Sequence, residues 1–140
     1  ENLEAKNEIS RLSTYWPVTI QRWAGLITKW ADQYVIDPDL IAAVMLAESG
    51  GDPDAVSRSG ARGLLQIMPF HFCVSFDPDQ NIGCGVSILA DYYHLADDDW
   101  RTGLAFYNCG PTGTRNNNCG IHGGLVYADL VLSHYANAKK

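Results

Sequence analysis

The sequence lacks a long apolar run. The longest, from Leu40 to Ala47, has eight residues, far short of the roughly 18 that suggest a membrane span. No transmembrane segment is therefore expected. The start of the chain, ENLEAKNEIS, also lacks an initiator Met and the basic and apolar regions of a signal peptide. We interpret it as a processed or trimmed start from which targeting information has been lost.

Clusters of basic residues are missing as well. The formal net charge is −6 and the sequence pI is near 4.9. No stretch of Lys and Arg could neutralise several phosphates of a nucleic acid at once. Nucleic acid is therefore excluded as an expected partner, and we expect neither a cofactor nor a partner subunit, so the protein should be a monomer.

Close Cys-x-x-Cys pairs, typical of structural zinc sites, are absent. The four cysteines permit three connectivities, of which the local bridges Cys73 to Cys84 and Cys109 to Cys119 are the simplest. Each small loop would be stabilised by roughly 3 kcal/mol. The alternative is a zinc site that also uses His71 and His122. Disulfides favour an exported protein, whether periplasmic, secreted or virion-associated.

Segments that alternate with a period of two are few, and helical patterns dominate the 140 residues. We expect an all-α fold with at most a minor β element. A short N-terminal segment, 1–16, should precede one compact domain, 17–140. GLLQIMP (63–69) could be a helical turn or a strand, and 112–124 should be a loop. The expected helices are 17–34, 38–49, 81–96, 100–109 and 125–135.

Glu48 ends the apolar run and stands out as a candidate acid. In a helix, residues three, four, seven and eight apart share a face, so Leu40 and Val44 lie on the stripe that carries Glu48. Burial there would raise the carboxyl pKa, possibly by two units or more, whereas a salt bridge to Arg58 or Arg62 would lower it. A carboxylic acid kept protonated by an apolar pocket can donate to a glycosidic oxygen.

A second carboxylate, which glycoside hydrolysis ordinarily needs, is not evident. Asp52 and Asp54 are the nearest in sequence, but the segment GGDPDA favours Asp side chains that set a turn. The other acids considered lie on or before helices and should be solvated or capping: Asp91, Asp97, Asp98, Asp99 and Asp129. Glu48 is thus a lone candidate acid with no obvious partner, a pattern that fits ordinary hydrolysis poorly.

Five features taken in order form a recognisable set. They are Glu48-Ser49, Ser57, GLLQIMP, LAFYNCGP (104–111) and Tyr127. In order and spacing this set closely resembles the lytic transglycosylases of the soluble-transglycosylase type, glycoside hydrolase family 23, over about Ile20 to Tyr135. The resemblance implies a lysozyme-like fold with a substrate cleft.

The resemblance also implies residue roles. Glu48 matches the family's sole catalytic acid and base, followed by Ser49 as in the family's Glu-Ser pair. Tyr127 matches the tyrosine that orients the catalytic Glu. Residues implied to contact the substrate are Ser49, Ser57, Gln66, Tyr107, Asn108 and Tyr127. Ordinary structural roles remain open for Gln66 with backbone groups, for Asn108 as a helix cap, and for the two tyrosines in the core.

Two segments depart from the family pattern. Phe70-His71-Phe72-Cys73 follows GLLQIMP where small residues are usual, and Cys109 with GTRNNNCGIHGG (113–124) rewrites the approach to Tyr127. We expect each loop to be pinned by its own bridge. The histidines at 71, 94, 122 and 134 are interpreted as structural or surface residues, and no metal is expected.

The implied reaction is cleavage of the β-1,4 bond between N-acetylmuramic acid and N-acetylglucosamine in peptidoglycan glycan strands, with a 1,6-anhydro product. Alternatives are a goose-type lysozyme-like or chitin-active hydrolase that uses an acid such as Asp52 or Asp54, and a non-catalytic glycan-binding protein on the same scaffold.

Overall fold

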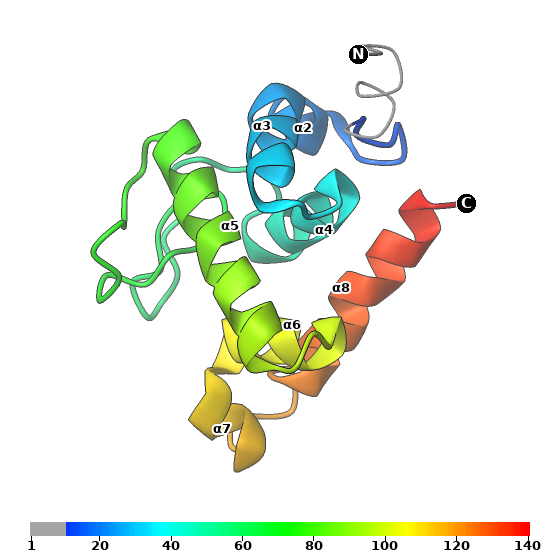
Figure 1. The fold of residues 1–140 in the computed structure, drawn as a ribbon. Helices are drawn as coiled ribbons and strands as arrows, with labels where there is room; N and C mark the ends of the chain where they lie inside the picture. The colour runs from blue at the N-terminus through cyan, green and yellow to red at the C-terminus, as the bar shows by residue number, and fades with distance from the viewer. Residues whose placement is uncertain (1–10) are drawn as a thin grey trace.

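The computed structural model describes residues 11–140, which form a single compact, helical domain (Figure 1). The helices are α2 (Val18–Gln21), α3 (Ala24–Tyr34), α4 (Pro38–Glu48), α5 (Pro78–Leu95), α6 (Trp100–Cys109), α7 (Pro111–Arg115) and α8 (Leu125–Ala138). Within 11–140, β-structure is limited to two antiparallel bridges that join Val56 to Arg62 and Arg62 to Ile67. The prediction of an all-α fold with at most a minor β element is confirmed, and GLLQIMP, for which a helical turn and a strand were both open, forms turns that lead into the bridge at Ile67.

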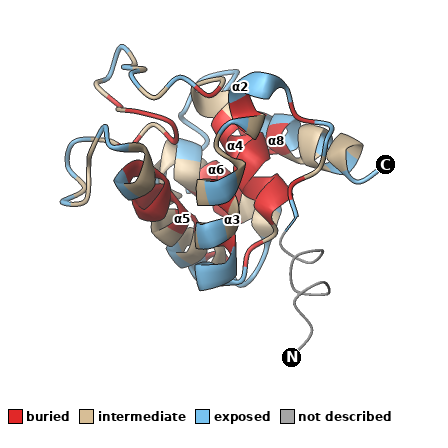
Figure 2. Cartoon of the chain, turned by 90° about the horizontal axis from the view of Figure 1, so that it is seen from above, coloured by how far each residue is buried: buried red, intermediate tan, exposed pale blue. Residues whose placement is uncertain are grey.

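Helix α4 forms the centre of the core (Figure 2). Its residues from Pro38 to Met45 are all buried, as expected for a helix that is apolar on every side. It packs against α8, α3 and α2. The Asp37 carboxylate caps its first turn by accepting a hydrogen bond from the backbone N–H of Asp39, and Pro38 occupies the first helical position.

The expected helix 17–34 is two helices, and the single-helix prediction is wrong. The chain bends at Trp23, whose N–H bonds the carbonyl of Ile20, three residues back, in place of the usual fourth. The Trp23 indole then donates to the carbonyl of Gly51, 3.0 Å away. A side chain at Gly51 would collide with the carbonyl oxygen of Thr19. The bend therefore seats α2 against the end of α4.

Three other boundaries differ from the prediction. Helix α5 begins at Pro78, because Asp77 caps the N–H of Gln80. A short helix, α7, begins at Pro111, a favoured first helical residue, and extends into the expected loop 112–124. Helix α8 continues to Ala138. Residues 1–10 lie outside the described part, so the expected segment 1–16 is seen only from Arg11. Leu12 and Trp16 pack in the core.

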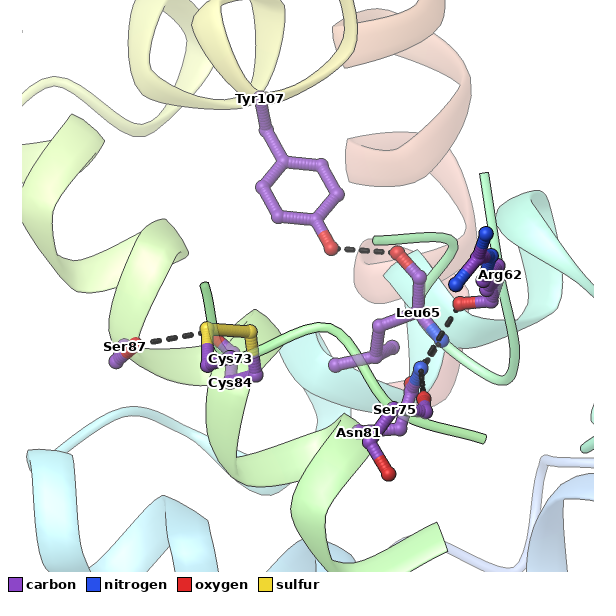
Figure 3. Close-up of a disulfide and its surroundings, with 8 residues drawn as sticks. All are labelled: Arg62, Leu65, Cys73, Ser75, Asn81, Cys84, Ser87 and Tyr107. Atoms are coloured by element: carbon purple, nitrogen blue, oxygen red, sulfur yellow. Dashed lines mark hydrogen bonds between the residues drawn. A yellow bond between two sulfur atoms is a disulfide. The ribbon is translucent and has the colours of Figure 1, made fainter. Parts of the chain in front are cut away.

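Both predicted bridges are present. Cys73 is joined to Cys84 and Cys109 to Cys119. The first ties the segment after GLLQIMP to α5 (Figure 3), and the second ties the end of α6 to the loop before α8. The zinc alternative needs cysteine thiolates, and all four cysteines are in these bridges. The two disulfides are typical of an oxidising compartment. No helix within 11–140 is long and apolar enough to span a membrane.

Candidate active site

Glu48 is the last residue of α4, and its carboxylate meets Tyr127 on α8. The Tyr127 hydroxyl donates to Glu48 Oε2 at 2.6 Å. Tyr127 lies in the first turn of α8 and is buried, whereas Glu48 keeps partial exposure. A residue from the central helix and one from the last helix, 79 positions apart, thus meet where the helix turns into the loop at Gly50.

The surroundings of Glu48 favour its protonated form. Burial raises its pKa, the bond from Tyr127 lowers it, and the balance is a pKa of about 7. Neither Arg58 nor Arg62 forms an ion pair with it in the described structure, and the Arg62 guanidinium lies 5.9 Å from the ring centre of Phe76 instead. The prediction of a desolvated carboxyl with a raised pKa is confirmed. Glu48 can therefore hold or release a proton near neutral pH.

Two buried phenols lie beside this carboxyl. Burial and the charge of Glu48 raise the pKa of both Tyr107 and Tyr127 well above the ordinary value. Both hydroxyls therefore stay protonated and act as donors. Tyr107 donates to the carbonyl of Leu65 at 2.6 Å (Figure 3), which joins α6 to the GLLQIMP segment.

A cavity of about 320 Å³ opens beside Tyr107, between the GLLQIMP segment, α5 and the end of α6. It carries three of the residues that the sequence singled out, Gln66, Tyr107 and Asn108. Glu48 does not itself line this cavity but lies close enough for its charge to act on Tyr107. The other lining residues are Ser59, Ile67, Met68, Phe70, His71, Ile88, Tyr92, Phe106, Cys109 and Gly110.

Gln66 and Asn108 both have the structural roles that the sequence left open. The Gln66 amide donates to the carbonyls of Ala55 and Gly63, at 3.1 and 3.0 Å. Asn108 Oδ1 accepts from the N–H of Gly124, at 2.8 Å, and so fixes the start of α8. Both also line the cavity. Hydrogen bonds to backbone groups therefore fix their side chains at the edge of the cavity.

The two serines lie elsewhere. The Ser49 hydroxyl donates to the Leu64 carbonyl at 2.7 Å and accepts from the N–H of Gly51. Ser57 accepts from the N–H of Ala61 at 3.0 Å. Neither lines the cavity. The structure uses both to shape the loop that follows α4.

A buried amide that the sequence reasoning missed holds this loop. Asn81 on α5 accepts from the N–H of Leu65 and donates to the carbonyls of Arg62 and Ser75 (Figure 3). Its burial is complete. Its position as a polar residue on the apolar stripe of α5 could have indicated this structural role. The aromatic lining from Phe70, Tyr92 and Phe106 was also missed, because residues from three separate segments form it.

Most of the other acids have structural partners. Asp52 accepts from the N–H of Asp54 in a turn, as predicted, and Asp99 caps α6. Asp98 and Asp129 form exposed pairs with His94 and Arg101. Asp91 and Asp97 are exposed. Glu48 therefore differs from these acids in being partly buried with one uncharged donor.

The family model described as the Transglycosylase SLT domain matches residues 25–120. The chain belongs to this family. It is 40% identical over 102 residues to membrane-bound lytic murein transglycosylase F of Desulfosudis oleivorans, covering 65% of this chain and 22% of that protein. It is 34% identical over 104 residues to the transglycosylase of Enterobacteria phage PRD1, covering 71% of this chain and 38% of that protein.

Solved structures of this transglycosylase type share the fold. The 70 kDa soluble lytic transglycosylase of Escherichia coli superposes with a TM-score of 0.71 at 24% identity, covering 84% of this chain and 24% of that chain. Lytic transglycosylase Slt of Pseudomonas aeruginosa gives 0.69 at 22% identity, covering 81% and 23%. This SLT domain thus has the all-α, lysozyme-like fold that its motifs predicted, and it spans only a fraction of the length of these relatives.

Proposed function

We propose that this SLT domain is the catalytic part of a peptidoglycan lytic transglycosylase, with Glu48 as its sole acid and base. One observation carries the proposal: burial raises the pKa of Glu48 to about 7, and the carboxyl accepts a hydrogen bond from the uncharged Tyr127 hydroxyl. A single group that is poised to give and take back a proton suits a reaction that needs no activated water.

In the proposed reaction, protonated Glu48 donates to the β-1,4 oxygen between N-acetylmuramic acid and N-acetylglucosamine. The bond from that oxygen to the muramic C1 breaks, with assistance from the neighbouring N-acetyl group. Glu48, now a carboxylate, takes the proton of the muramic C6 hydroxyl, and the C6 oxygen bonds to C1. The 1,6-anhydro ring closes, Glu48 is protonated again, and no water is consumed.

The other residues would support this step from fixed positions. Tyr127 orients the carboxyl by its 2.6 Å bond. Gln66, Tyr107 and Asn108 would contact the sugars from the cavity that they line. Ser49 and Ser57, predicted as substrate contacts, are bonded to backbone groups and would act by shaping the loop.

The substrate would be the glycan strands of the cell wall, and the domain, 17–140, would act as a monomer. Its two disulfides suit a periplasmic, secreted or virion-associated setting. The curated relatives include a membrane-bound protein and a phage protein, and both settings bring an enzyme to peptidoglycan.

Mass spectrometry of digested peptidoglycan tests the proposal. Fragments that end in 1,6-anhydromuramic acid are expected. Reducing ends would instead make the protein a hydrolase of the goose-type lysozyme or chitin-active kind, and no released fragments, with glycan binding retained, would make it a non-catalytic glycan-binding protein. Either result would overturn the proposal.

A further inference from the structure

Phe70 and His71 stand at the mouth of the cavity that carries Gln66, Tyr107 and Asn108. Phe70 is 75% exposed although it lines that cavity. Its ring lies against the imidazole of His71, with centres 4.4 Å apart and planes inclined by 35°. The two rings thus form one aromatic surface that solvent can reach.

This surface is held in place from both sides. The N–H of His71 bonds the Met68 carbonyl and the His71 carbonyl accepts from Val74, each at 3.1 Å. Two residues beyond His71, the bridge from Cys73 to Cys84 fixes the chain to α5, and Asn81 holds the segment again at Ser75 (Figure 3). A fixed aromatic surface loses little conformational freedom when a ligand covers it.

The chemistry of the surface suits a sugar ring. Burial lowers the pKa of His71, so the imidazole is uncharged at neutral pH. The C–H face of a pyranose is apolar and packs on aromatic rings, while its hydroxyl and acetamido groups need polar partners. The amides of Gln66 and Asn108 line the same cavity and supply polar groups.

We propose that Phe70, backed by His71, is the stacking wall of a sugar-binding subsite for an N-acetylated pyranose of the glycan strand. This role rests on the proposed function. Phe70 would set how tightly a strand binds without touching the reacting atoms. Phe72, two residues along, is fully exposed and does not line this cavity, so it is a matched control in the same loop.

Binding is tested with the tetrasaccharide of β-1,4-linked N-acetylglucosamine and the Glu48→Gln variant, by titration calorimetry. Adding Phe70→Ala should raise Kd about five-fold, because about 1 kcal/mol of apolar contact is lost. Phe70→Trp should keep Kd near the parent value, and Phe72→Ala should not change it. An unchanged Kd in Phe70→Ala, an equal rise in Phe72→Ala, or no binding of the tetrasaccharide would overturn the subsite.

Turnover separates this subsite from the proposed function. With Glu48 intact and uncross-linked glycan strands as substrate, Phe70→Ala should raise KM about five-fold and leave kcat within about two-fold. A loss confined to kcat would overturn the stacking role. If the unaltered protein releases no fragments, the proposed function fails, while the Kd contrast between Phe70→Ala and Phe72→Ala still decides the subsite.

Discussion

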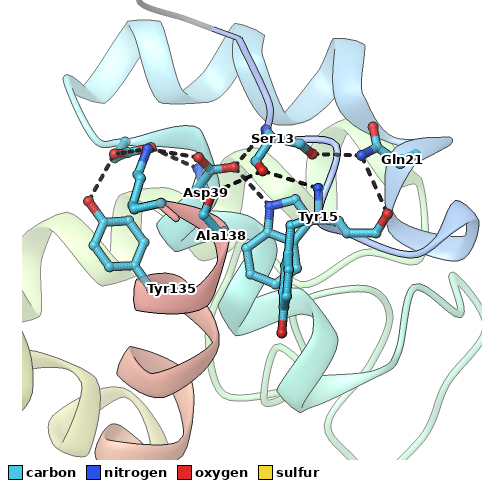
Figure 4. Close-up of polar contacts among 9 residues, drawn as sticks. Ser13, Tyr15, Gln21, Asp39, Tyr135 and Ala138 are labelled. Atoms are coloured by element: carbon cyan, nitrogen blue, oxygen red, sulfur yellow. Dashed lines mark hydrogen bonds and ion pairs between the residues drawn. The ribbon is translucent and has the colours of Figure 1, made fainter.

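The two ends of helix α4 hold carboxylates in opposite situations. At the start, Asp39 is 2% exposed and accepts from the N–H of Ser13, the Trp16 indole and Lys139, at 2.7 to 2.9 Å (Figure 4). Its neighbour Asp37 accepts from Tyr135 and Lys139. At the other end, Tyr127 is the one hydrogen-bond donor to the Glu48 carboxyl among residues 11–140.

The difference shows that burial alone does not make a carboxylate an acid catalyst. Burial also raises the pKa of Asp37, but its bonds from Lys139, the Asp39 N–H and Tyr135 outweigh that effect and lower it overall. No cation in the described part of the chain pairs with Glu48, and its pKa rises to about 7. The donors supplied by neighbouring elements decide which end of the helix is structural and which is suited to proton transfer.

The largest expected effect comes from removing the acid itself. Glu48→Gln should lower the rate of glycan cleavage by at least about 1,000-fold, because the amide can neither donate nor accept the transferred proton. The fold should remain, since the amide oxygen still accepts from Tyr127. Release of anhydromuropeptides measures the rate, and circular dichroism checks the fold. Retained activity would remove Glu48 from the catalytic role.

At the other end of α4, Asp39→Ala should cost about 4 kcal/mol in the free energy of unfolding. It removes a buried carboxylate that bonds Lys139, and it leaves the Ser13 N–H and the Trp16 indole without their acceptor. Urea denaturation measures the loss. Asp129→Ala, which breaks the exposed pair with Arg101, is the control and should cost less than about 1 kcal/mol. Equal costs would show that Asp39 is no more structural than a surface acid.

The pH dependence of stability should differ between wild type and Glu48→Gln. Folding raises the Glu48 pKa from 4.5 to about 7, so the folded state binds the proton more tightly and stability falls as pH rises through that window. The loss is about 3 kcal/mol when complete. The stability of Glu48→Gln relative to wild type should therefore be higher by that amount at pH 8 than at pH 4. A difference that does not change with pH would mean that Glu48 is not desolvated.

The smallest expected effect comes from the phenol on Glu48. Tyr127→Phe removes the bond that lowers the Glu48 pKa, so the alkaline fall of kcat/KM should move to higher pH. We also expect about a ten-fold lower kcat, because the carboxyl loses its orienting partner. Tyr135→Phe, which removes a donor from Asp37 at the other end of α4, is the matched control and should leave the pH profile unchanged. A profile that moves in both variants would contradict the assigned role.

Local signals in the sequence correctly predicted the starts of two helices. Asp37-Pro38 and Asp99 start α4 and α6 as expected, because a capping carboxylate acts on N–H groups two or three residues away. The break at Trp23 could not be predicted in this way, because the indole bonds Gly51 in a distant segment. Helix α7 was missed because the Gly- and Asn-rich composition around it is typical of loops, although Pro111 could have indicated a start.

The sequence predicted some residues of the candidate site but not their contacts. Helical periodicity and the family motifs identified Glu48, and the structure supplies the Tyr127 bond and the raised pKa. The motif predicted that Ser49 and Ser57 lie near the site. It could not predict their hydrogen bonds, which go to backbone groups. The Phe70 surface was not predicted, because its position depends on a bridge to α5 and on three elements that meet around one cavity.

By itself, the sequence determined the helical class, the local disulfides, the family and the carboxylate, Glu48, at the end of α4. All of these depend on the spacing of residues along the chain. Tertiary structure alone decided the pKa of that carboxyl. Asp37 and Glu48 bound the same helix, and the chain's path brings Lys139 and Tyr135 to one and Tyr127 to the other. A pKa depends on burial and on donors within a few ångströms, and those neighbours come from parts of the chain that only folding brings together.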